Sequence, residues 1–338
     1  RNQMTADVPV AAFLSGGIDS TLIAALMQEQ SSRPVNTFTV GFTEQAYDEA
    51  ADAQKVAQHL GTDHTEIVLD WSDVLPLVER LPDMFNEPFA DSSQLPTHLA
   101  SALAREKVTV AVTGDGGDEV FGGYNRHILG VAYERYSRFL PDIFHHPLGW
   151  FLKSISQPRF AGIIVRLAQL CGLGRERLPT ERLNKIGNVL AGGGDVGALY
   201  ASLVRRDGGL ISSDAFIEHI AALAHRVSHD EFNMPEQLML MDTISYLPDD
   251  ILHKVDRASM AVGLEIRCPF LDHKLFELAW SLPTGARFRG GRSKAVLRDM
   301  LAQRVPSHLI DRPKAGFSVP LENWLRGPLR SWLHDLIA

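Results

Sequence analysis

Two glycine-rich segments flanked by hydroxyl and acidic side chains have the residue types that bind phosphate groups. The first reads Ser-Gly-Gly-Ile-Asp-Ser at residues 15–20. Glycines let the backbone approach phosphate oxygens, and the free N–H groups at a helix start point toward an anion. Asp19 would repel a phosphate unless a cation such as Mg²⁺ bridges the two. The segment therefore predicts a phosphate-binding loop with Asp19 as a Mg²⁺ ligand, and the alternative is a strand-to-helix turn capped by Asp19.

The second segment reads Thr-Gly-Asp-Gly-Gly-Asp-Glu at residues 113–119. Three acids this close together repel one another unless a cation is present. Asp118 is the candidate for a second Mg²⁺ ligand, and Asp115 is a candidate proton acceptor facing the reacting centre. The alternative is a solvated acidic turn without a ligand.

Both segments directly follow apolar runs that predict buried strands. The predicted strands cover residues 8–14, 35–42, 64–69 and 108–113. The predicted helices between them cover residues 20–30, 48–61 (with Asp48 as cap and Gly61 as stop) and 92–106. Strands that alternate with helices indicate an α/β fold whose parallel sheet has helices on both faces. Ligands bind such sheets where strands end, which is where the two glycine-rich segments lie.

The pattern changes after Tyr124, where helical periodicity replaces the strand signals and no further strand is predicted. The sequence therefore predicts an α/β nucleotide-binding core over residues 1–125. A mostly α-helical part over residues 126–338 is expected to complete the substrate site.

Composition excludes several classes of protein. The 338 residues are 45% hydrophobic, which is enough to form a substantial core. The formal net charge is −8 and no cluster of Lys and Arg is present, so a nucleic-acid partner is not expected. The apolar runs are too short to span a membrane, and a cytoplasmic protein is expected. The two cysteines, Cys171 and Cys268, lie far apart and predict neither a disulfide nor a zinc site.

Three other features of the sequence argue against rival sites. Residues 192–197 match Gly-x-Gly-x-x-Gly, but they follow a predicted helix rather than the strand that a dinucleotide site requires. His145 and His146 are adjacent in sequence, which is not metal-ligand spacing. No Gly-x-x-x-x-Gly-Lys-Ser/Thr motif occurs, which disfavours a P-loop enzyme that transfers the γ-phosphate.

The hexapeptide at residues 15–20 resembles the pyrophosphate-binding loop (PP-loop) of the N-type ATP pyrophosphatases, which cleave ATP between its α and β phosphates. The remainder of the chain resembles one branch of that group, the asparagine synthetase family. The similar segments run in family order at residues 47–49, 86–91, 113–124, 246–250, 255–260, 265–272, 293–298, 312–317 and 324–326. The resemblance implies a fold of the PP-loop type.

The resemblance also implies roles for individual residues. Lys294 corresponds to the family's catalytic lysine, and Asp115 lies where the family carries an acid beside the reacting carboxylate. Asp19 and Asp118 would hold Mg²⁺, and Glu265 and Arg267 belong to a segment near the substrate pocket. The residues expected to contact ATP are Leu14, Ser15, Gly16, Gly17, Ile18, Asp19, Ser20, Val40, Thr113 and Gly114.

The reaction implied by the resemblance joins ATP and L-aspartate to give β-aspartyl-adenylate and pyrophosphate, after which ammonia displaces AMP to give asparagine. One alternative is a related ligase that forms an amide on another carboxylate, of the sugar, peptide or β-lactam type. A second is a non-catalytic regulatory protein that only binds nucleotide. The joint presence of Asp19, Asp118 and Lys294 disfavours the second, because a binder needs no transition-state cation.

Glutamine-hydrolysing members of the family carry an upstream domain whose nucleophile is an N-terminal Cys, whereas residue 1 here is Arg. We therefore expect this chain to be the synthetase half of a longer protein, with an upstream glutaminase domain supplying ammonia. A homodimer is a further expectation. The family often carries Ser where Thr113 lies and Leu where Ile18 lies, and both changes preserve the chemical type of the side chain.

Overall fold

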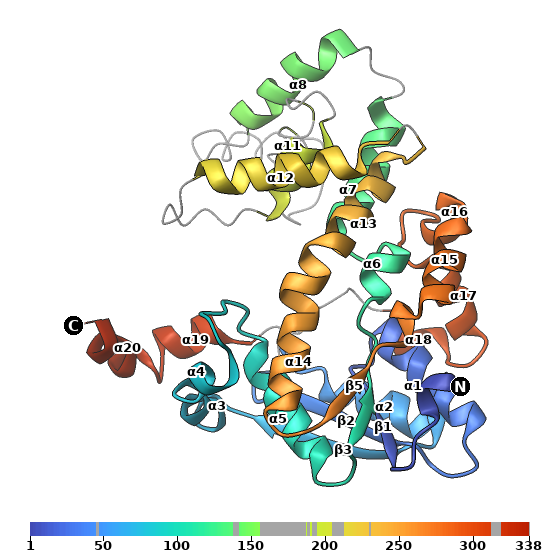
Figure 1. Cartoon of the computed structure of the whole chain (residues 1–338), viewed down its shortest axis with the longest axis vertical. Helices are drawn as coiled ribbons and strands as arrows, with labels where there is room; N and C mark the ends of the chain where they lie inside the picture. The colour runs from blue at the N-terminus through green and yellow to red at the C-terminus, as the bar shows by residue number, and fades with distance from the viewer. Residues whose placement is uncertain are drawn as a thin grey trace, which may run out of the picture. The chain divides into compact units, whose positions relative to one another are not determined.

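The computed structural model describes residues 1–44, 47–137, 142–155, 187, 190, 195–204, 213–229, 231–311 and 319–337 (Figure 1). The chain divides into two compact units. The first unit comprises Arg1–Phe121, Ser245–Ala286 and Lys294–Ala338, and the second comprises Gly122–Ile244 and Arg287–Ser293. The predicted division of the chain into residues 1–125 and 126–338 stays a prediction. Cys171, the glycine run 192–194 and the family-like segment 312–317 lie outside the described residues.

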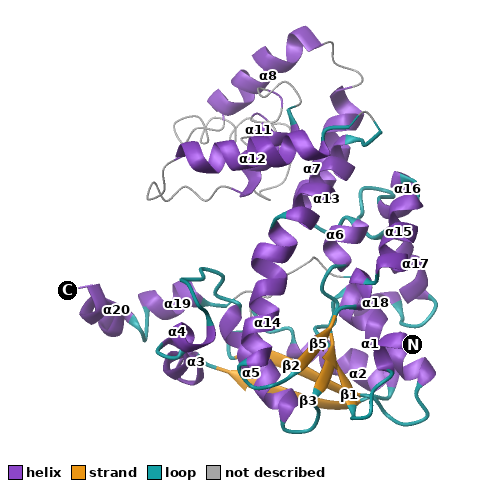
Figure 2. Ribbon diagram, in the orientation of Figure 1, coloured by secondary structure: helices purple, strands orange, loops and turns teal. Residues whose placement is uncertain are grey.

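The first unit is built on a five-stranded sheet in which every described pair of strands is parallel (Figure 2). The strands are β1 (Val10–Phe13), β2 (Asn36–Phe42), β3 (Asp63–Leu69), β4 (Val110–Val112) and β5 (Glu265–Arg267). Their order across the sheet is β3-β2-β1-β4-β5. The predicted parallel α/β fold is therefore confirmed, and the four predicted strands are present with shifts of up to two residues at their ends.

Strand β5 corrects the prediction that no strand follows Tyr124. It pairs with β4 through the register Val110↔Glu265 and Val112↔Arg267, and it lies at the edge of the sheet. Three residues are too few to establish the alternating pattern by which a strand is recognised in sequence. Its formation depends on the neighbouring strand β4, which is distant in the chain.

Helices cover both faces of the sheet. Successive side chains of β1 point in opposite directions, so neighbouring residues of this strand pack against helices on opposite faces. Ala12 packs in one core cluster with Leu22 and Ile23 of α1 (Ile18–Gln30). Ala11 packs on the opposite face with Phe38 of β2 and Ala104 of α5 (Gln94–Arg105). The central strand is thus buried on both sides, as the apolar run around it predicts.

Helix α2 (Ala50–Leu60) follows the predicted start and stop signals closely. The Asp48 carboxylate accepts a hydrogen bond of 2.9 Å from the backbone N–H of Ala50. Gly61 ends the helix in the left-handed conformation with φ of 71°, a backbone geometry that glycine adopts without steric penalty. The predicted stop at Gly61 is confirmed, whereas the N-cap residue is Glu49 rather than the predicted Asp48, one residue later.

The other elements of the first unit cluster around this sheet. A π-helical turn covers Leu247–Leu252 and leads into α14 (His253–Met260), while 3₁₀ turns cover Asn2–Met4 and Pro269–Leu271. The remaining helices are α3 (Trp71–Val78), α4 (Leu81–Met84), α6 (Gly117–Phe121), α15 (His273–Ser281), α16 (Thr284–Arg287), α17 (Ala295–Ala302), α18 (Ser307–Ile310), α19 (Leu321–Arg326) and α20 (Arg330–Ile337).

The second unit consists mainly of helices over its described residues, with an isolated antiparallel bridge between Arg289 and Arg292. Its helices are α7 (Asn125–Ser137), α8 (Asp142–Ile155), α11 (Val196–Val204), α12 (Ser213–Val227) and α13 (Met234–Ile244). The buried Asp242 carboxylate accepts hydrogen bonds from Arg126 Nε and His127 Nε2, both at 2.6 Å, and from the Tyr200 hydroxyl at 2.7 Å. A buried carboxylate with three donors is satisfied, so this network fixes α7, α11 and α13 to one another.

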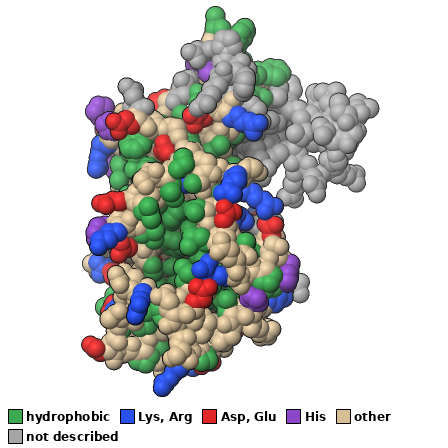
Figure 3. Space-filling view, turned by 90° about the vertical axis from the view of Figure 1, so that its right-hand side faces the viewer, with side chains coloured by type: hydrophobic (Ala, Val, Ile, Leu, Met, Phe, Trp, Pro, Cys, Tyr) green, Lys and Arg blue, Asp and Glu red, His purple; other side chains and the backbone are tan. Residues whose placement is uncertain are grey.

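The molecular surface mixes charges of both signs on the face drawn in Figure 3, where hydrophobic side chains also gather between the charged ones. Such mixing produces no single-sign field over that face. Among exposed apolar side chains of the first unit, Leu278 of α15 is 59% exposed. Within the described residues, no helix combines the length and apolar character needed to cross a membrane.

Candidate active site

The two glycine-rich loops lie side by side because the strands that precede them are neighbours. Strands β1 and β4 pair in parallel through Val10↔Val110 and Ala12↔Val112, so their carboxyl ends reach the same edge of the sheet. The strand order also reverses at this pair, since the chain runs from β1 outward to β3 on one side and continues with β4 on the other. Such a switch point is where open α/β sheets bind ligands.

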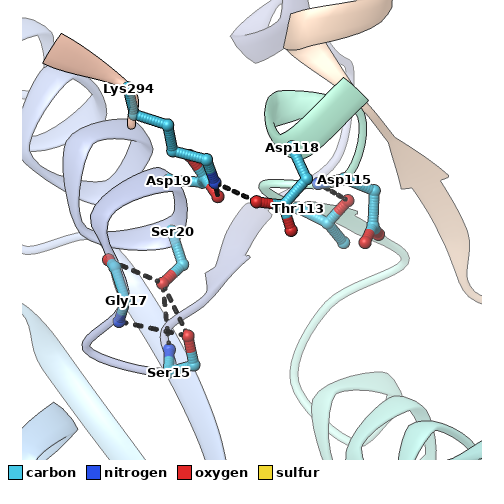
Figure 4. A network of polar contacts seen from close by, with 8 residues as sticks. All are labelled: Ser15, Gly17, Asp19, Ser20, Thr113, Asp115, Asp118 and Lys294. Atoms are coloured by element: carbon cyan, nitrogen blue, oxygen red, sulfur yellow. Dashed lines mark hydrogen bonds and ion pairs between the residues drawn. The ribbon is translucent and has the colours of Figure 1, made fainter. Parts of the chain in front are cut away.

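The first loop, residues 15–20, is held by its own hydroxyl groups (Figure 4). Ser15 Oγ and Ser20 Oγ lie 2.9 Å apart, Ser20 Oγ accepts from the backbone N–H of Ser15 at 3.2 Å, and Ser15 Oγ accepts from that of Gly17 at 3.2 Å. Gly16 adopts φ of 68°, and Gly17 is the residue before α1 begins. The loop therefore presents a preformed helix start, as a phosphate-binding loop requires.

The glycines of the second loop permit close contact with the first. A Cβ atom on Gly114 would lie 2.8 Å from Asp19 Cβ and 2.9 Å from the backbone nitrogen of Ser20. A Cβ atom on Gly117 would lie 2.8 Å from Asp19 Cγ. These distances are shorter than van der Waals contact, so any larger residue would push Asp19 away from the second loop.

We expect Gly114→Ala to destabilise the fold by about 1–3 kcal/mol, the usual cost of overpacking, and to weaken ATP binding. The matched control is Gly285→Ala, because nothing lies within 4 Å of a Cβ atom at Gly285, which belongs to α16. Alanine in a helix should leave that variant unchanged or stabilise it by up to about 1 kcal/mol. Denaturant unfolding and nucleotide titration measure both variants. Equal behaviour of the two variants would contradict the close packing of the loops.

Lys294 joins the two loops through their acids (Figure 4). Its Nζ atom forms an ion pair with Asp19 Oδ2 from the first loop and lies 2.5 Å from Asp118 Oδ1 of the second. Lys294 is only 4% exposed, whereas both carboxylates keep some solvent access. Burial alone would lower the pKa of the Lys294 ammonium, but the charges of Asp19 and Asp118 raise it above its ordinary value. Lys294 is therefore a permanent cation.

The backbone at Lys294 is held in an unusual conformation. Lys294 has φ of 56° and ψ of 37°, and it is the only described residue other than glycine with a positive φ. It immediately precedes α17, whose first turn contains Ala295. A long side chain in the left-handed region carries a conformational cost of about 1–3 kcal/mol, and such residues cluster at functional sites. The cost fits a lysine whose ammonium position matters more than local stability.

Asp115 differs from Asp118 in the direction of its side chain. In Figure 4 the Asp115 carboxylate points away from Lys294, toward the side of the second loop where Thr113 lies. Burial raises the pKa of Asp115, while a hydrogen bond with Thr113 and the positive charge of Lys254 act in the opposite direction. Thr113 Oγ1 also lies 3.5 Å from Cys268 Sγ. Burial, with the nearby charge of Asp115, raises the pKa of the Cys268 thiol to about 12, so this thiol stays protonated and unreactive.

Asp19 and Asp118 form a donor set that fits Mg²⁺. Their carboxylates already converge on one cation, the Lys294 ammonium, and carboxylate oxygens are the ligands that Mg²⁺ prefers. Within the described part of the chain, no group of three or more His, Cys, Asp and Glu side chains is arranged around a common metal position. Two carboxylates are nevertheless sufficient where phosphate oxygens and water supply the remaining ligands.

Other predicted site residues lie near these loops or are engaged elsewhere. Leu14 directly follows β1 and is a buried core residue, and Val40 is buried within β2. Glu265 is exposed on β5, and Arg267 bonds to Glu265 Oε1 at 2.7 Å and to the backbone oxygens of Gln3 and Thr5 at 2.9 Å. The contacts of Arg267 are thus made with its own strand and with the N-terminal segment. The assigned roles of these four residues stay predictions.

A partly buried ion pair was not assigned from the sequence. Lys254 Nζ lies 2.7 Å from Asp91 Oδ2, although 163 residues separate the two in the chain. Both residues lie in or beside segments that resemble the asparagine synthetase family, at residues 86–91 and 255–260. That proximity to family-like segments was the available signal, but only the fold brings the two side chains together.

Comparison with known proteins identifies the group to which this architecture belongs. The family model described as "Asparagine synthase" matches residues 1–338. The match confirms the resemblance inferred from the segments around both loops and around Lys294. It also agrees with the parallel sheet that carries the two loops.

Individual relatives cover nearly the whole chain. "Asparagine synthetase [glutamine-hydrolyzing] 1" of Bacillus subtilis (strain 168) is 30% identical over 342 residues, covering 99% of this chain and 50% of the relative. A putative asparagine synthetase [glutamine-hydrolyzing] of Mycobacterium tuberculosis (strain ATCC 25618 / H37Rv) is 32% identical over 336 residues, covering 99% of this chain and 49% of the relative. "Amidase chry2" of Gibberella zeae is 26% identical over 365 residues, covering 100% of this chain and 53% of the relative. The chain spans about half the length of these relatives and belongs to the asparagine synthase family.

Proposed function

We propose that this chain is an ATP-dependent carbon–nitrogen ligase that forms asparagine from L-aspartate and ammonia, with release of AMP and pyrophosphate. The observation that carries the proposal is the position of Lys294, whose ammonium contacts one carboxylate from each of the two glycine-rich loops. A fixed cation between two potential metal ligands, at the carboxyl ends of β1 and β4, suits a reaction on a polyphosphate. Membership of the asparagine synthase family supports the same chemistry.

The first step activates the acid. A side-chain carboxylate oxygen of aspartate attacks the α-phosphorus of ATP, and the bond from that phosphorus to the oxygen bridging toward the β-phosphate breaks. Negative charge grows on the transferring and leaving phosphates, and a buried ammonium such as that of Lys294 stabilises such charge. The backbone N–H groups of residues 15–20 would bind phosphate oxygens of the nucleotide.

Asp19 and Asp118 would hold the Mg²⁺ ion that the carboxylate pair fits. When bound, this ion supplies charge neutralisation for the departing pyrophosphate. Asp19 and Asp118 also fix the position of Lys294, because its ammonium is paired with both. The same two carboxylates thus serve the metal and the lysine.

The second step makes the amide. The nitrogen of ammonia attacks the acyl carbon of β-aspartyl-adenylate, the bond from that carbon to the phosphate oxygen breaks, and AMP leaves. The nitrogen must then lose a proton. Asp115 is the candidate acceptor, because a carboxylate with a raised pKa is a stronger base than an exposed one. Thr113 and Gly114 lie between the end of β4 and Asp115 in the chain.

A second candidate function is amide formation on a different carboxylate. The relative named "Amidase chry2", which aligns with all of this chain, favours keeping this alternative. Both versions use the same adenylation chemistry and differ in the acid that occupies the substrate pocket. A nucleotide-binding regulatory role is less favoured, because a binder gains nothing from the conformational cost at Lys294.

The source of nitrogen is a further part of the proposal. The Bacillus subtilis and Mycobacterium tuberculosis relatives carry the words "glutamine-hydrolyzing" in their names and are about twice as long as the aligned region. We therefore propose that a glutaminase domain upstream of this chain supplies ammonia. A cytoplasmic location and a homodimeric assembly stay predictions from sequence.

The experiment that tests the function supplies ATP, Mg²⁺ and ammonium chloride together with a panel of carboxylic acids, and measures pyrophosphate and amide. L-aspartate should give the highest rate and asparagine as product. Because free ammonia is the nucleophile, the ammonia-limited rate should rise with pH until groups on the enzyme titrate. A different acid as the best substrate would favour the alternative ligase. No pyrophosphate with any acid would refute the proposed reaction.

A further inference from the structure

The hydroxyl of Thr39, in β2, bonds to the backbone at the entrance to the first loop. Thr39 is only 4% exposed, and its Oγ1 donates a hydrogen bond to the carbonyl oxygen of Leu14. Leu14 directly follows β1 and directly precedes Ser15, the first residue of the loop. Buried hydroxyl groups normally have a hydrogen-bond partner, and here that partner is the last residue before the loop. The reaction described above gives Thr39 no role.

This bond lies where the backbone pairing of β1 with β2 ends. The last paired residues are Phe13 and Phe38, and beyond them the Leu14 N–H donates to the Phe38 carbonyl at 2.9 Å. Thr39 then bonds the carbonyl of Leu14 through its side chain. Two consecutive residues of β2 therefore hold both backbone polar groups of Leu14.

The Leu14 carbonyl and the Ser15 N–H belong to one peptide unit, which is planar and does not rotate about its C–N bond. The carbonyl end of this unit accepts from Thr39, and the N–H end donates to Ser20 Oγ at 3.2 Å. The unit is thus held at one end by the sheet and at the other end by the loop. Fixing the direction of the carbonyl also fixes the direction of the Ser15 N–H.

From this peptide unit the contacts continue to the start of α1 (Figure 4). Ser20 Oγ lies 2.9 Å from Ser15 Oγ, which accepts from the backbone N–H of Gly17 at 3.2 Å. Gly17 is the residue before α1 begins. A site whose groups are already oriented binds its ligand more tightly, because less order has to be created on binding. The orientation of the phosphate-binding loop therefore depends on a hydroxyl from the neighbouring strand.

We propose that Thr39 is a positioning residue for the first loop: its hydroxyl fixes the peptide unit between Leu14 and Ser15, and thereby the direction of the loop N–H groups toward the nucleotide. Thr39 acts through this peptide unit and is not required to touch the nucleotide. The inference rests on the proposed function, because it takes residues 15–20 to bind ATP.

The same strand offers a matched control. Thr37 lies two residues before Thr39, so both side chains point to the same face of the sheet. Thr37 is 0% exposed, and its Oγ1 lies 2.9 Å from Thr62 Oγ1 and 3.0 Å from His64 Nδ1. Its hydroxyl is therefore buried and bonded as well, but toward β3 instead of the loop. Thr37→Val and Thr39→Val remove the same group from the same strand, and only the second releases the Leu14 carbonyl.

Binding of MgATP to the free chain, measured by equilibrium titration without aspartate, tests the proposal. Thr39→Val keeps the shape of the side chain but cannot donate to Leu14. Its dissociation constant for MgATP should rise by about 3- to 10-fold, the effect of losing one hydrogen bond. Thr39→Ser keeps the hydroxyl and should bind nearly as tightly as the wild type. Thr37→Val should retain wild-type affinity even though its thermal stability also falls.

Two results of this titration would overturn the proposal. One is wild-type affinity for MgATP in Thr39→Val, because the loop would then keep its orientation without the hydroxyl. The other is equal weakening in Thr37→Val and Thr39→Val, because the loss would then come from general destabilisation of β2.

Hydrogen exchange of the Ser15 amide reports on the peptide unit itself, with no nucleotide present. This N–H donates to Ser20 Oγ, and it should exchange several-fold faster in Thr39→Val, because the carbonyl of the same unit is released. In Thr37→Val the Ser15 amide should exchange as in the wild type. Unchanged exchange of Ser15 in Thr39→Val would contradict the positioning role, whatever the affinity for MgATP.

A further variant keeps the test decisive if Thr39→Val fails to fold. Thr39→Cys retains a thiol, which is a weaker donor than a hydroxyl. Thr39→Cys and Thr39→Ser both lack the methyl group of threonine, so they differ mainly in the strength of the donor. The cysteine variant should bind MgATP more weakly than the serine variant. Equal affinities of the two would refute the role of the hydroxyl.

Turnover measurements separate this inference from the proposed function. In Thr39→Val the KM for ATP should rise by about the same factor as the dissociation constant, whereas the KM for L-aspartate should stay unchanged. An equal rise in both KM values would show a general disturbance of the site and refute the positioning role. A wild-type chain that binds MgATP but forms no pyrophosphate would refute the proposed reaction, while binding and amide exchange would still decide the role of Thr39.

Discussion

Replacing Lys294 with methionine should lower aspartate-dependent pyrophosphate release by about 10²- to 10³-fold, the usual effect of removing one group that stabilises transition-state charge. Methionine keeps an unbranched apolar stem but has no ammonium. The ammonium of Lys294 is paired with Asp19 and Asp118, so the substitution also leaves two neighbouring acids without their shared cation. Steady-state pyrophosphate release at saturating ATP measures the loss.

The same variant should bind Mn²⁺, used as a probe for Mg²⁺, more tightly than the wild type. The Lys294 ammonium and a divalent cation would both lie beside the carboxylates of Asp19 and Asp118, so removing the ammonium removes a positive charge that repels the metal. Lys55→Met controls for the loss of one positive charge from the chain, because Lys55 is exposed and pairs with Asp52. A slow Lys294→Met variant with unchanged Mn²⁺ affinity would refute the shared site, and near-normal turnover would refute the catalytic role.

Asp118→Asn and Asp19→Asn should each lose most activity, by about 10²-fold or more, because each removes charge from the pair that would hold Mg²⁺. Asparagine preserves the shape of the side chain, so the loops should keep their packing around Gly114 and Gly117. Raising the Mg²⁺ concentration should recover part of the rate if the defect lies in metal binding. Pyrophosphate release as a function of Mg²⁺ concentration measures both effects.

Asp52→Asn is the matched control for these two variants, since Asp52 is an exposed acid whose partner is Lys55 at 2.9 Å. It should retain wild-type activity at all Mg²⁺ concentrations. Near-normal turnover of Asp19→Asn or Asp118→Asn at ordinary Mg²⁺ would refute the metal assignment. Unfolding measurements on the same proteins separate a chemical defect from a loss of structure.

The parts of the site that sequence could predict are those encoded locally. The strand runs before Ser15 and Thr113 and the glycines that follow them indicate two loops at strand ends. Parallel pairing then explains why both loops reach one edge of the sheet. The stop of α2 at Gly61 was similarly predictable, because a left-handed residue at a helix end favours glycine.

The parts that sequence could not predict depend on contacts between distant segments. The pair of Asp91 with Lys254 and the edge strand β5 exist only after the chain has returned to the sheet. Arg267 illustrates the same limit: a cation expected near a substrate carboxylate bonds instead to Glu265 and to N-terminal carbonyl groups. Spacing along the chain gives no information about such partners, because burial and side-chain direction are set by the whole fold.

The bond of ATP that is cleaved tests the central claim most directly. The chain is incubated with ATP, Mg²⁺, L-aspartate and ammonium chloride, and the spent nucleotide is separated by chromatography. The geometry of Lys294, Asp19 and Asp118 at the two loops leads us to predict AMP and pyrophosphate in amounts equal to the asparagine formed. ADP and phosphate as the main aspartate-dependent products would contradict adenylation and with it the proposed function.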